Sequence, residues 1–451
     1  MTAFHAQLTE EWGNEAIRWR DNLYFTPVEG YYTYPDTTVE APRKKRIAIV
    51  TQGVKLGDET RGYTRFRFIA QALAEAGFDV DLITSTFQHW DKAQRDTTLA
   101  CYKGLPYRIQ FVYEPGYKRN LDLARINSHR VLAGNLRRFF KDRFANNPTA
   151  YDLIYSEIPP NDMARTCAEI ARENGIPYVP DINDLWPEAM RMAVNVPVLS
   201  DIAFSPFARD AKKTYDLIAA AVGTSDEYAN QPSKYRDDNY HRITVYVGNE
   251  LEKFDSGAAA QASAIEKPDD ELWVIYAGTL GASYDIATLI EAAVIAAKEN
   301  HSIRVKILGD GPDRAKLEEQ AARLNAPVDF VGYAPYELMA AYLKASDITV
   351  NSLVKSAPQS IITKIGDYLA AGIPMINTGS SPEFRAKVDA DGFGINVEAE
   401  DAEALAKASV ELASDDERRC SMGAIARRIA EEQFDQPTSY QAIVELISSL
   451  V

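Results

Sequence analysis

One segment near the C-terminus carries polar residues that could bind an anion. It runs from Pro358 to Pro374 and reads PQSIITKIGDYLAAGIP. Its apolar residues recur at helical spacing, which predicts a helix opening between Pro358 and Ser360. The free N–H groups and dipole of such a helix could hold a phosphate, with Lys364 reaching the same anion and Asp367 accepting hydrogen bonds from sugar hydroxyls. The alternative is an ordinary amphipathic helix, but the polar residues cluster toward its N-terminal end, which favours a binding site.

Two glycine-rich turns precede this segment. Gly278 and Gly281 follow one apolar run, and Gly309 and Gly311 follow the next. Glycine at a strand end lets the backbone approach a ligand closely, and the next helix could present free N–H groups to an anion. Taken alone, the first turn is equally consistent with a simple connection between strand and helix. The second alone favours that simpler interpretation, because Pro312 is typical of a helix start.

The elements that must position these residues alternate regularly. Short apolar runs, typical of strands buried on both faces, alternate with segments of helical spacing. This alternation predicts an α/β protein with two doubly wound, Rossmann-like domains facing a central cleft, in which ligands bind at the carboxyl ends of the strands. The predicted strands are 47–50, 80–84, 109–113, 153–155, 178–182, 219–223, 243–247, 272–278, 305–308, 328–331, 348–351 and 375–377.

Changes in composition indicate the domain boundaries. Residues 1–44 are an aromatic-rich extension, which we expect to pack on the next domain rather than bind a partner. Residues 45–252 form the N-terminal domain and residues 271–436 the C-terminal domain. A linker rich in small and polar residues is predicted at 253–270. Residues 437–451 form a C-terminal helix that could cross back to the N-terminal domain.

Composition limits the class of protein. The chain has 451 residues, with 49 Lys+Arg and 65 Asp+Glu, so its net charge is 49 − 65 = −16. Nucleic acid is therefore excluded as a partner, because it requires a basic surface. The three scattered cysteines indicate neither a disulfide framework nor a zinc site. No signal peptide or apolar stretch of spanning length is present, so we expect a cytoplasmic enzyme. Motifs of zinc proteases, serine hydrolases, P-loop kinases and classical dehydrogenases are absent.

Together these motifs match a known family. The chain resembles GT-B glycosyltransferases of the family 4 type, which are retaining and use nucleotide-sugars, and especially the branch that builds bacterial cell-surface polysaccharides. The resemblance extends from about Arg46 to the C-terminus. The motifs that carry it are Arg61–Arg65, Asp184–Glu188, Gly278-Thr279-Leu280-Gly281, Leu308-Gly309-Asp310-Gly311-Pro312, Val331-Gly332-Tyr333, Ala345-Ser346-Asp347 and Lys364–Pro374.

The resemblance implies a role for each domain. The C-terminal domain would bind a nucleotide diphosphate-sugar, and no metal or other cofactor would be needed because helix dipoles and basic side chains stabilise the leaving diphosphate. The N-terminal domain would hold a glycan or lipid-linked sugar acceptor. The implied catalytic residues are Lys364, Gln359 and Asp184; the donor site is Gly278, Thr279, Gly281, Gly309, Gly311, Gly332, Tyr333, Ser360, Lys364 and Asp367; the acceptor site is Arg61, Arg65, Asn183 and Asp184.

The sequence departs from the family pattern at several positions. Thr279 and Tyr284 align where many relatives carry an arginine and a lysine. Gln359 and Asp367 align with two glutamates, the first of which contacts the donor sugar and the second the ribose. Two alternatives therefore stay open: a non-catalytic partner protein with the same fold, and a nucleotide-sugar 2-epimerase. The epimerase would need acids and histidines in its cleft, which this sequence supplies poorly.

A local basic region raises the question of membrane contact. Between Lys103 and Arg143 there are ten Lys/Arg and three Asp/Glu, a local charge of 10 − 3 = +7. Within residues 121–144, apolar and basic side chains share a helix, which could dock on anionic lipid at the inner face of the membrane. The alternative, which we favour, is a helix that packs on a sheet and exposes a basic face.

Overall fold

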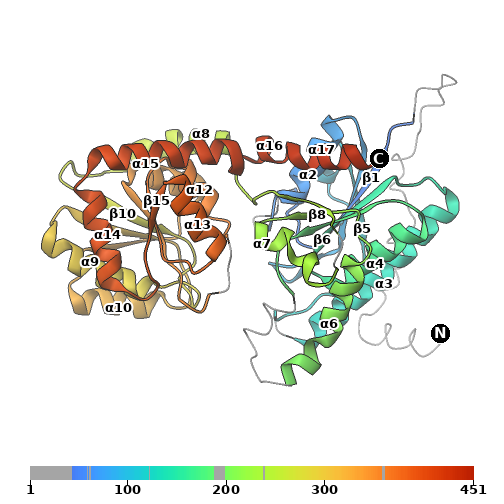
Figure 1. Cartoon of the computed structure of the whole chain (residues 1–451), viewed down its shortest axis with the longest axis horizontal. Helices are drawn as coiled ribbons and strands as arrows, with labels where there is room; N and C mark the ends of the chain where they lie inside the picture. The colour runs from blue at the N-terminus through green and yellow to red at the C-terminus, as the bar shows by residue number, and fades with distance from the viewer. Residues whose placement is uncertain are drawn as a thin grey trace. The chain divides into compact units, whose positions relative to one another are not determined.

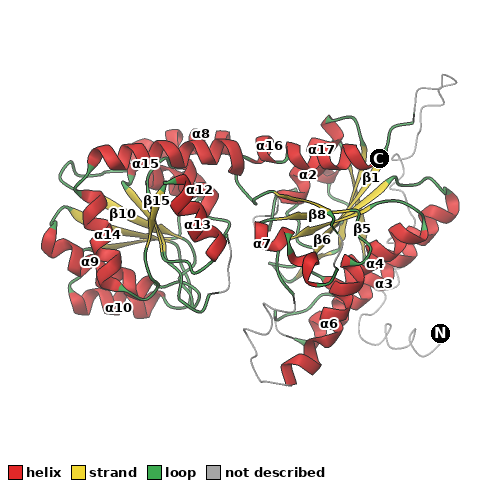
Figure 2. Cartoon of the chain, viewed as in Figure 1, coloured by secondary structure: helices red, strands yellow, loops and turns green. Residues whose placement is uncertain are grey.

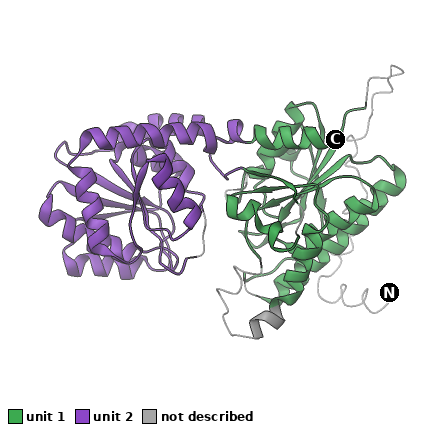
Figure 3. Cartoon of the chain, viewed as in Figure 1, with its two compact units in different colours: residues 1–244, 440–451 green, residues 245–439 purple. Residues whose placement is uncertain are grey.

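The computed structural model describes residues 43–451 except 58, 60–61, 121, 187–198, 237–238 and 358–360, and only the backbone of 199–203. The chain divides into two compact units, Met1–Thr244 with Tyr440–Val451 and Val245–Ser439 (Figure 3). Each unit contains one parallel sheet flanked by helices (Figure 2). In the described part of the chain, no helix combines the length and the apolar character needed to cross a membrane.

The sheet of unit 1 has the strand order β5-β2-β1-β6-β7-β8-β9, and every neighbouring pair is parallel. A short antiparallel hairpin, β3–β4, follows β2. The strands are β1 (Arg46–Thr51), β2 (Asp79–Ser85), β3 (Phe87–Gln88), β4 (Ala93–Gln94), β5 (Arg108–Val112), β6 (Leu153–Ile158), β7 (Tyr178–Ile182), β8 (Ala220–Gly223) and β9 (His241–Thr244). The helices are α2 (Arg65–Glu75), α3 (Leu123–Asn146), α4 (Asn161–Glu173), α6 (Leu199–Tyr215), α7 (Asp226–Ala229) and α17 (Gln441–Leu450).

The helices of unit 1 cover both faces of its sheet. Helices α3, α4 and α6 lie on one face, and α2 and α17 on the other (Figure 1). The C-terminal helix α17 buries Ile443 and Ile447, and it packs against α2 within this unit. All six residues of β6 are buried, so its run of largely apolar residues fits a strand covered on both faces.

Unit 2 repeats the arrangement with the strand order β12-β11-β10-β13-β14-β15, again all parallel. Helices α9, α10 and α14 pack on one face, and α8, α11, α12, α13 and α15 on the other. The strands are β10 (Leu272–Ala277), β11 (Ile303–Leu308), β12 (Val328–Gly332), β13 (Ile348–Asn351), β14 (Met375–Asn377) and β15 (Gly394–Asn396). The helices are α8 (Leu251–Gln261), α9 (Ile286–Glu299), α10 (Arg314–Leu324), α11 (Tyr336–Ala345), α12 (Ile365–Ala370), α13 (Pro382–Asp391), α14 (Ala402–Ala413), α15 (Asp416–Ile429) and α16 (Gln436–Ser439).

The linker expected at 253–270 is in large part a helix. Helix α8 covers the first nine of these residues, and it buries Leu251, Phe254 and Ala258 in the core of unit 2. The small residues that suggested a flexible segment instead allow close packing, since a Cβ on Gly257 would lie 3.0 Å from the Glu337 side chain on α11. Composition alone gave a wrong prediction here, because an alanine-rich segment can equally form a helix, for which alanine has the highest propensity.

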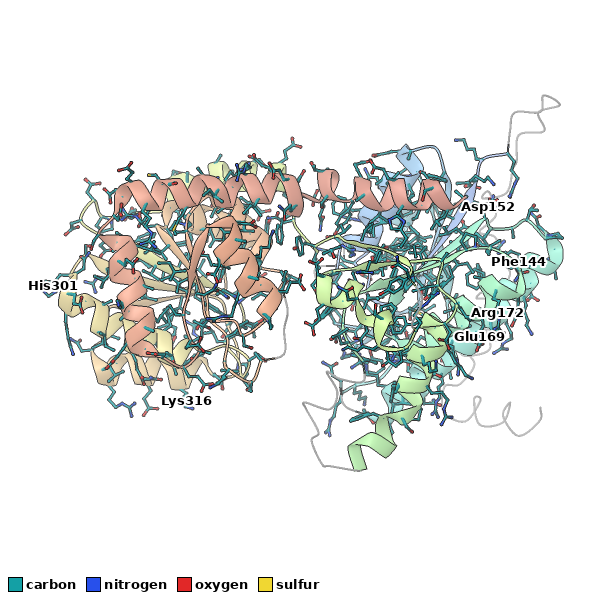
Figure 4. All side chains as sticks on the ribbon, in the orientation of Figure 1. Phe144, Asp152, Glu169, Arg172, His301 and Lys316 are labelled. Carbon is teal, nitrogen blue, oxygen red and sulfur yellow. The ribbon has the colours of Figure 1, made fainter. Side chains whose placement is uncertain are left out.

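Four of the apolar side chains of α3 face the sheet. Leu132, Leu136, Phe139 and Phe140 are all buried in the core of unit 1. Basic residues of the same helix are paired with protein: Arg137 binds Glu169 and Glu173 of α4, and Figure 4 labels Glu169 on that helix. These four apolar residues therefore cover the sheet, whereas Leu123 in the first turn of α3 is 81% exposed, so a membrane contact through 121–144 stays a prediction.

Candidate functional site

The loops after β10, β11 and β12 are joined by backbone hydrogen bonds. Gly278 N donates to Leu308 O at 2.9 Å, and Gly309 N donates to Gly332 O at 2.7 Å. Gly309 has a φ of +126°, and a Cβ at this position would lie 1.8 Å from the carbonyl oxygen of Gly278. Only glycine fits such a close approach. The three loops therefore form one closely packed surface at the carboxyl ends of their strands.

Lys364 holds its ammonium group over this surface. Its Nζ donates a hydrogen bond to the hydroxyl of Tyr276 at 3.0 Å and lies 4.1 Å and 4.0 Å from the ring centroids of Tyr276 and Tyr284. A Cβ on Gly278 would lie 2.3 Å from Nζ. Among the described residues, no carboxylate forms an ion pair with this ammonium. Burial lowers the pKa of Lys364 to about 7. An anionic ligand would supply the missing counter-charge.

Asp367 lies one turn after Lys364. Its Oδ1 accepts hydrogen bonds from Asn249 Nδ2 at 2.7 Å and from the Tyr336 hydroxyl at 2.8 Å. Burial raises the pKa of Asp367, and these two hydrogen bonds oppose that shift. Its Oδ2 has no hydrogen-bond partner within the described chain, so this oxygen can accept from a ligand hydroxyl.

Tyr368 fixes α12 to the end of β10. Its hydroxyl donates to the carbonyl oxygen of Ala277 at 3.0 Å and accepts from the amide of the same residue at 2.9 Å. This pair of bonds satisfies the last backbone groups of the strand and sets the distance between the glycine turn and Lys364. Nothing in the sequence signals this contact, because its two partners are 91 residues apart.

The predicted helix start is wrong in position. Helix α12 begins at Ile365, with Lys364 as its N-cap residue, and the preceding described residues form turns. Ile361, Ile362 and Thr363 are β-branched, which lowers their helix propensity, and both isoleucines pack on the core of unit 2. Helix α12 has only six residues, so the anion-binding group that the structure offers is the Lys364 ammonium and not a helix dipole. Gln359 and Ser360 lie outside the described residues.

The remaining residues predicted for the donor site differ in how closely they are packed and how exposed they are. A Cβ on Gly311 would lie 2.1 Å from the Leu280 carbonyl oxygen, whereas one on Gly281 would find no atom nearer than 3.8 Å. The carbonyl oxygen of Thr279 accepts a hydrogen bond from the Tyr276 hydroxyl. Tyr333, which follows Gly332 and β12, is 80% exposed. The structure therefore brings Gly278, Gly309, Gly311, Gly332 and Lys364 into one set of loops. Four further residues of this site were not predicted from the sequence, namely Tyr276, Tyr336, Tyr368 and Asn249.

The predicted acceptor residue Arg65 has a different role. Its side chain is 1% exposed, and its Nε donates to Oδ2 of Asp181 at 2.8 Å. The hydroxyl of Tyr155 donates to the same oxygen at 2.6 Å, and the ring of Tyr440 lies 5.0 Å from the guanidinium carbon. Arg65 therefore joins β6, β7 and the C-terminal segment inside unit 1. It does not face an acceptor, because its charge is already neutralised in the interior.

The other predicted acceptor residues follow β7. Asn183 Nδ2 donates to the carbonyl oxygen of Asp181 at 2.9 Å. The Asp184 carboxylate accepts from the amide of Leu185 at 2.8 Å and from the indole nitrogen of Trp186 at 3.1 Å. These bonds shape the loop at the carboxyl end of β7 and leave both side chains part-buried. Arg61 lies outside the described residues.

A segment of unit 2 that includes the glycine loops matches a known protein family. Residues 271–415 match the family described as glycosyl transferases group 1. The matched segment contains Lys364, Asp367 and all the glycine loops described above. The match supports glycosyl transfer as the function. No curated protein matches the chain by sequence.

Solved structures share the fold over most of the chain. An Anabaena HepE structure in complex with UDP has a TM-score of 0.64 at 16% identity and covers 90% of this chain and 100% of its own. Another HepE structure contains UDP-glucose. Sucrose-phosphate synthase from Thermosynechococcus elongatus has a TM-score of 0.62 at 19% identity, covering 90% and 99%. A UDP-forming α,α-trehalose-phosphate synthase from Burkholderia vietnamiensis has a TM-score of 0.62 at 13% identity, covering 90% and 100%. These neighbours establish the GT-B fold, as predicted.

Proposed function

We propose that the chain is a retaining glycosyltransferase that moves a hexosyl group from a nucleoside diphosphate-sugar to a glycan or lipid-linked sugar acceptor, without a metal ion, in cell-surface polysaccharide synthesis. The observation that carries the proposal is the Lys364 ammonium, held over a glycine surface with no carboxylate partner among the described residues. The group 1 match and the UDP and UDP-glucose bound to HepE support a nucleotide-sugar as the donor.

Lys364 would act on the leaving group. When the bond between the sugar and the diphosphate breaks, negative charge grows on the diphosphate oxygen that leaves. A cation fixed in a poorly hydrated place stabilises that charge more strongly than water does, and it needs no reorganisation at the moment of reaction. The two tyrosine rings restrict water around Nζ, which packs against Gly278, where a Cβ would lie 2.3 Å from it.

Asp367 would orient the nucleotide. Its Oδ1 is held by Asn249 and Tyr336, so the carboxylate is fixed, while Oδ2 is left for a ribose hydroxyl. Gln359 and Asp184 stay candidates for contact with the donor sugar and with the acceptor.

A nucleotide screen tests the proposal. Purified protein is heated with UDP, GDP, ADP, TDP or CMP in metal-free buffer. One diphosphate should raise the melting temperature selectively, because a ligand at about 100 times its Kd stabilises the folded state by roughly 2.7 kcal/mol. If none of the five shifts a well-folded sample, the donor site does not exist. The non-catalytic partner protein would then be the better description.

Nucleotide affinity should fall as pH rises above 7. The pKa of Lys364 is lowered to about 7 by burial, and a bound diphosphate favours the charged form, so binding takes up a proton above pH 7. Between pH 7 and 9 the Kd should rise by up to about tenfold per pH unit. The phosphate groups are largely ionised between pH 7 and 9, since their second pKa is about 6. Calorimetry in two buffers of different ionisation enthalpy measures the proton uptake. A pH-independent Kd in this range would contradict the assigned environment of Lys364.

A further inference from the structure

Two cations lie over one aromatic ring in unit 1. The Nζ of Lys92, in the turn of the β3–β4 hairpin, lies 4.8 Å from the ring centroid of Tyr117. The guanidinium carbon of Arg125, in the first turn of α3, lies 5.5 Å from the same centroid and 4.7 Å from that of Trp186. These residues come from the segments that follow β2, β5 and β7. The carboxyl ends of these parallel strands lie at one edge of the sheet, which is where α/β folds bind ligands.

Within the described residues, both cations lack an acidic partner. Lys92 donates to the carbonyl oxygen of His89 and to Oδ1 of Asn120 at 2.7 Å, and Arg125 donates through Nη1 to the Asn120 carbonyl oxygen at 3.0 Å. All of these acceptors are neutral. The Nε of Arg125 is buried and finds no hydrogen-bond partner among the residues described. Neither cation forms an ion pair with any carboxylate in the part of the chain that is described. Burial and then the charge of Arg125 lower the pKa of Lys92.

The groups around the two cations do not neutralise them. The charge of Glu114 raises the pKa of Lys92, but Glu114 forms no ion pair with it among the described residues. The Glu114 carboxylate is buried and accepts hydrogen bonds from Gln52 and Ser128, and burial raises its pKa. Two histidines beside the cations stay neutral near pH 7, because burial lowers the pKa of His89 to about 4 and that of His129 to about 3. The cluster therefore carries excess positive charge inside a protein whose net charge is −16.

Space for the body of a ligand lies next to this cluster. His129 stacks on Trp186 with 6.0 Å between ring centroids, and its Nε2 is buried and has no hydrogen-bond partner in the described part of the chain. The same histidine lines a pocket of about 300 Å³ between α3, α4 and α6, together with Ile126, Arg165 and Phe207. Aromatic and polar groups thus continue from the cation pair into an open volume.

We infer that Lys92 and Arg125 bind an anionic group of the acceptor, either a phosphate or a carboxylate. The inference rests on the proposed function, because an acceptor has meaning only for a transferase. The Lys92 ammonium and the Arg125 guanidinium both lie against the Tyr117 ring, and each can match the oxygens of either anion through charge-assisted hydrogen bonds. The Tyr117 ring contacts both cations and the Trp186 ring contacts Arg125, and these cation–π contacts lower the cost of keeping two like charges close together.

Calorimetric titrations of the full-length Lys364→Met protein test this inference, since that background removes the cation of unit 2. The probes are glucose 1-phosphate for the phosphate, glucuronic acid for the carboxylate, and glucose as the neutral reference. Lys92→Met and Arg125→Met should each weaken binding of the preferred anionic probe by about tenfold, or about 1.4 kcal/mol. The matched control is Lys118→Met, an exposed lysine of the same segment, which should bind as its parent does. Lys92→Arg and Arg125→Lys keep the charge and should retain most of the affinity.

Several results would overturn the inference. Binding of glucose as tightly as both anions would contradict the anion site, as would binding of neither anion or parental anion affinity in both methionine variants. If Arg125→Met fails to fold, Lys92→Met alone decides, because its side chain is only part-buried. A nucleotide titration of the wild type separates the two proposals. If the wild type binds no nucleotide but Lys92→Met still weakens anion binding, the transferase proposal is contradicted and the anion site stands. If nucleotide binds but Lys92→Met has no effect on anion binding, only the anion site is contradicted.

Discussion

Replacing Lys364 with methionine should lower the rate of sugar transfer by about 10²–10³-fold, which is the usual loss when one preorganised donor to a developing oxyanion is removed. Affinity for the nucleoside diphosphate selected in the screen should fall as well, by about tenfold or more, because the lost contact is a charge-assisted hydrogen bond. Isothermal calorimetry and a coupled assay for released diphosphate measure the two effects.

The reason for so large an effect is that, among the residues the structure describes, the ammonium has no partner of opposite charge. Its Nζ donates to a tyrosine hydroxyl and lies over two aromatic rings, and burial lowers the pKa of Lys364 to about 7. Methionine fills a similar volume without a charge to desolvate. The variant should therefore be at least as stable as the wild type near pH 7 when no nucleotide is present, which separates loss of function from loss of fold.

Lys316→Met is the matched control for this experiment. Lys316 is exposed on α10 of the same unit, where Figure 4 shows it at the surface. The control should keep wild-type affinity and rate. If Lys364→Met transferred sugar at the wild-type rate, the ammonium would have no part in catalysis. If Lys364→Met lost nucleotide binding while a partner transferase remained fully active with it, the non-catalytic alternative would be favoured.

Asp181→Asn should destabilise the protein by about 3–5 kcal/mol, the cost of leaving a buried charge without its partner. The Arg65 and Asp181 side chains are 1% and 0% exposed, and they meet at 2.8 Å. Asparagine keeps the shape of aspartate but supplies no negative charge to the guanidinium. Urea unfolding at 25 °C, followed by circular dichroism, measures the change in the midpoint and in the free energy of unfolding.

Glu173→Gln provides the comparison for this prediction. Glu173 pairs with Arg137 at 2.9 Å on the surface of unit 1, and its side chain is 46% exposed. An exposed ion pair contributes about 0–1 kcal/mol, so this variant should unfold almost like the wild type. Equal losses in the two variants would show that burial does not set the strength of the Arg65–Asp181 pair. A fully stable Asp181→Asn protein with impaired transfer would instead return Arg65 to the acceptor site.

Much of the fold could be predicted from the sequence because buried parallel strands leave a strong local signal. The run Leu272–Ala277 is apolar throughout and every residue is buried, so its role follows from composition over six positions. Gly309 and Gly311 could be placed at a strand end for the same reason, since a glycine pair after such a run is typical of a tight turn. The π-helical turn at Ala430–Phe434 and the β3–β4 hairpin gave no comparable signal.

The sequence by itself determined which residues could carry charge and which segments could form a sheet. It placed Lys364 beside a glycine surface through a motif, but it did not reveal that Tyr276 and Tyr284 enclose the ammonium, because those rings come from 88 and 80 positions earlier. The family resemblance predicted Arg65 for the acceptor site, whereas the tertiary structure pairs it with Asp181, 116 positions away. Local spacing cannot decide such contacts, since the partner of a polar side chain depends on which strands become neighbours in the sheet and on what else is buried with it.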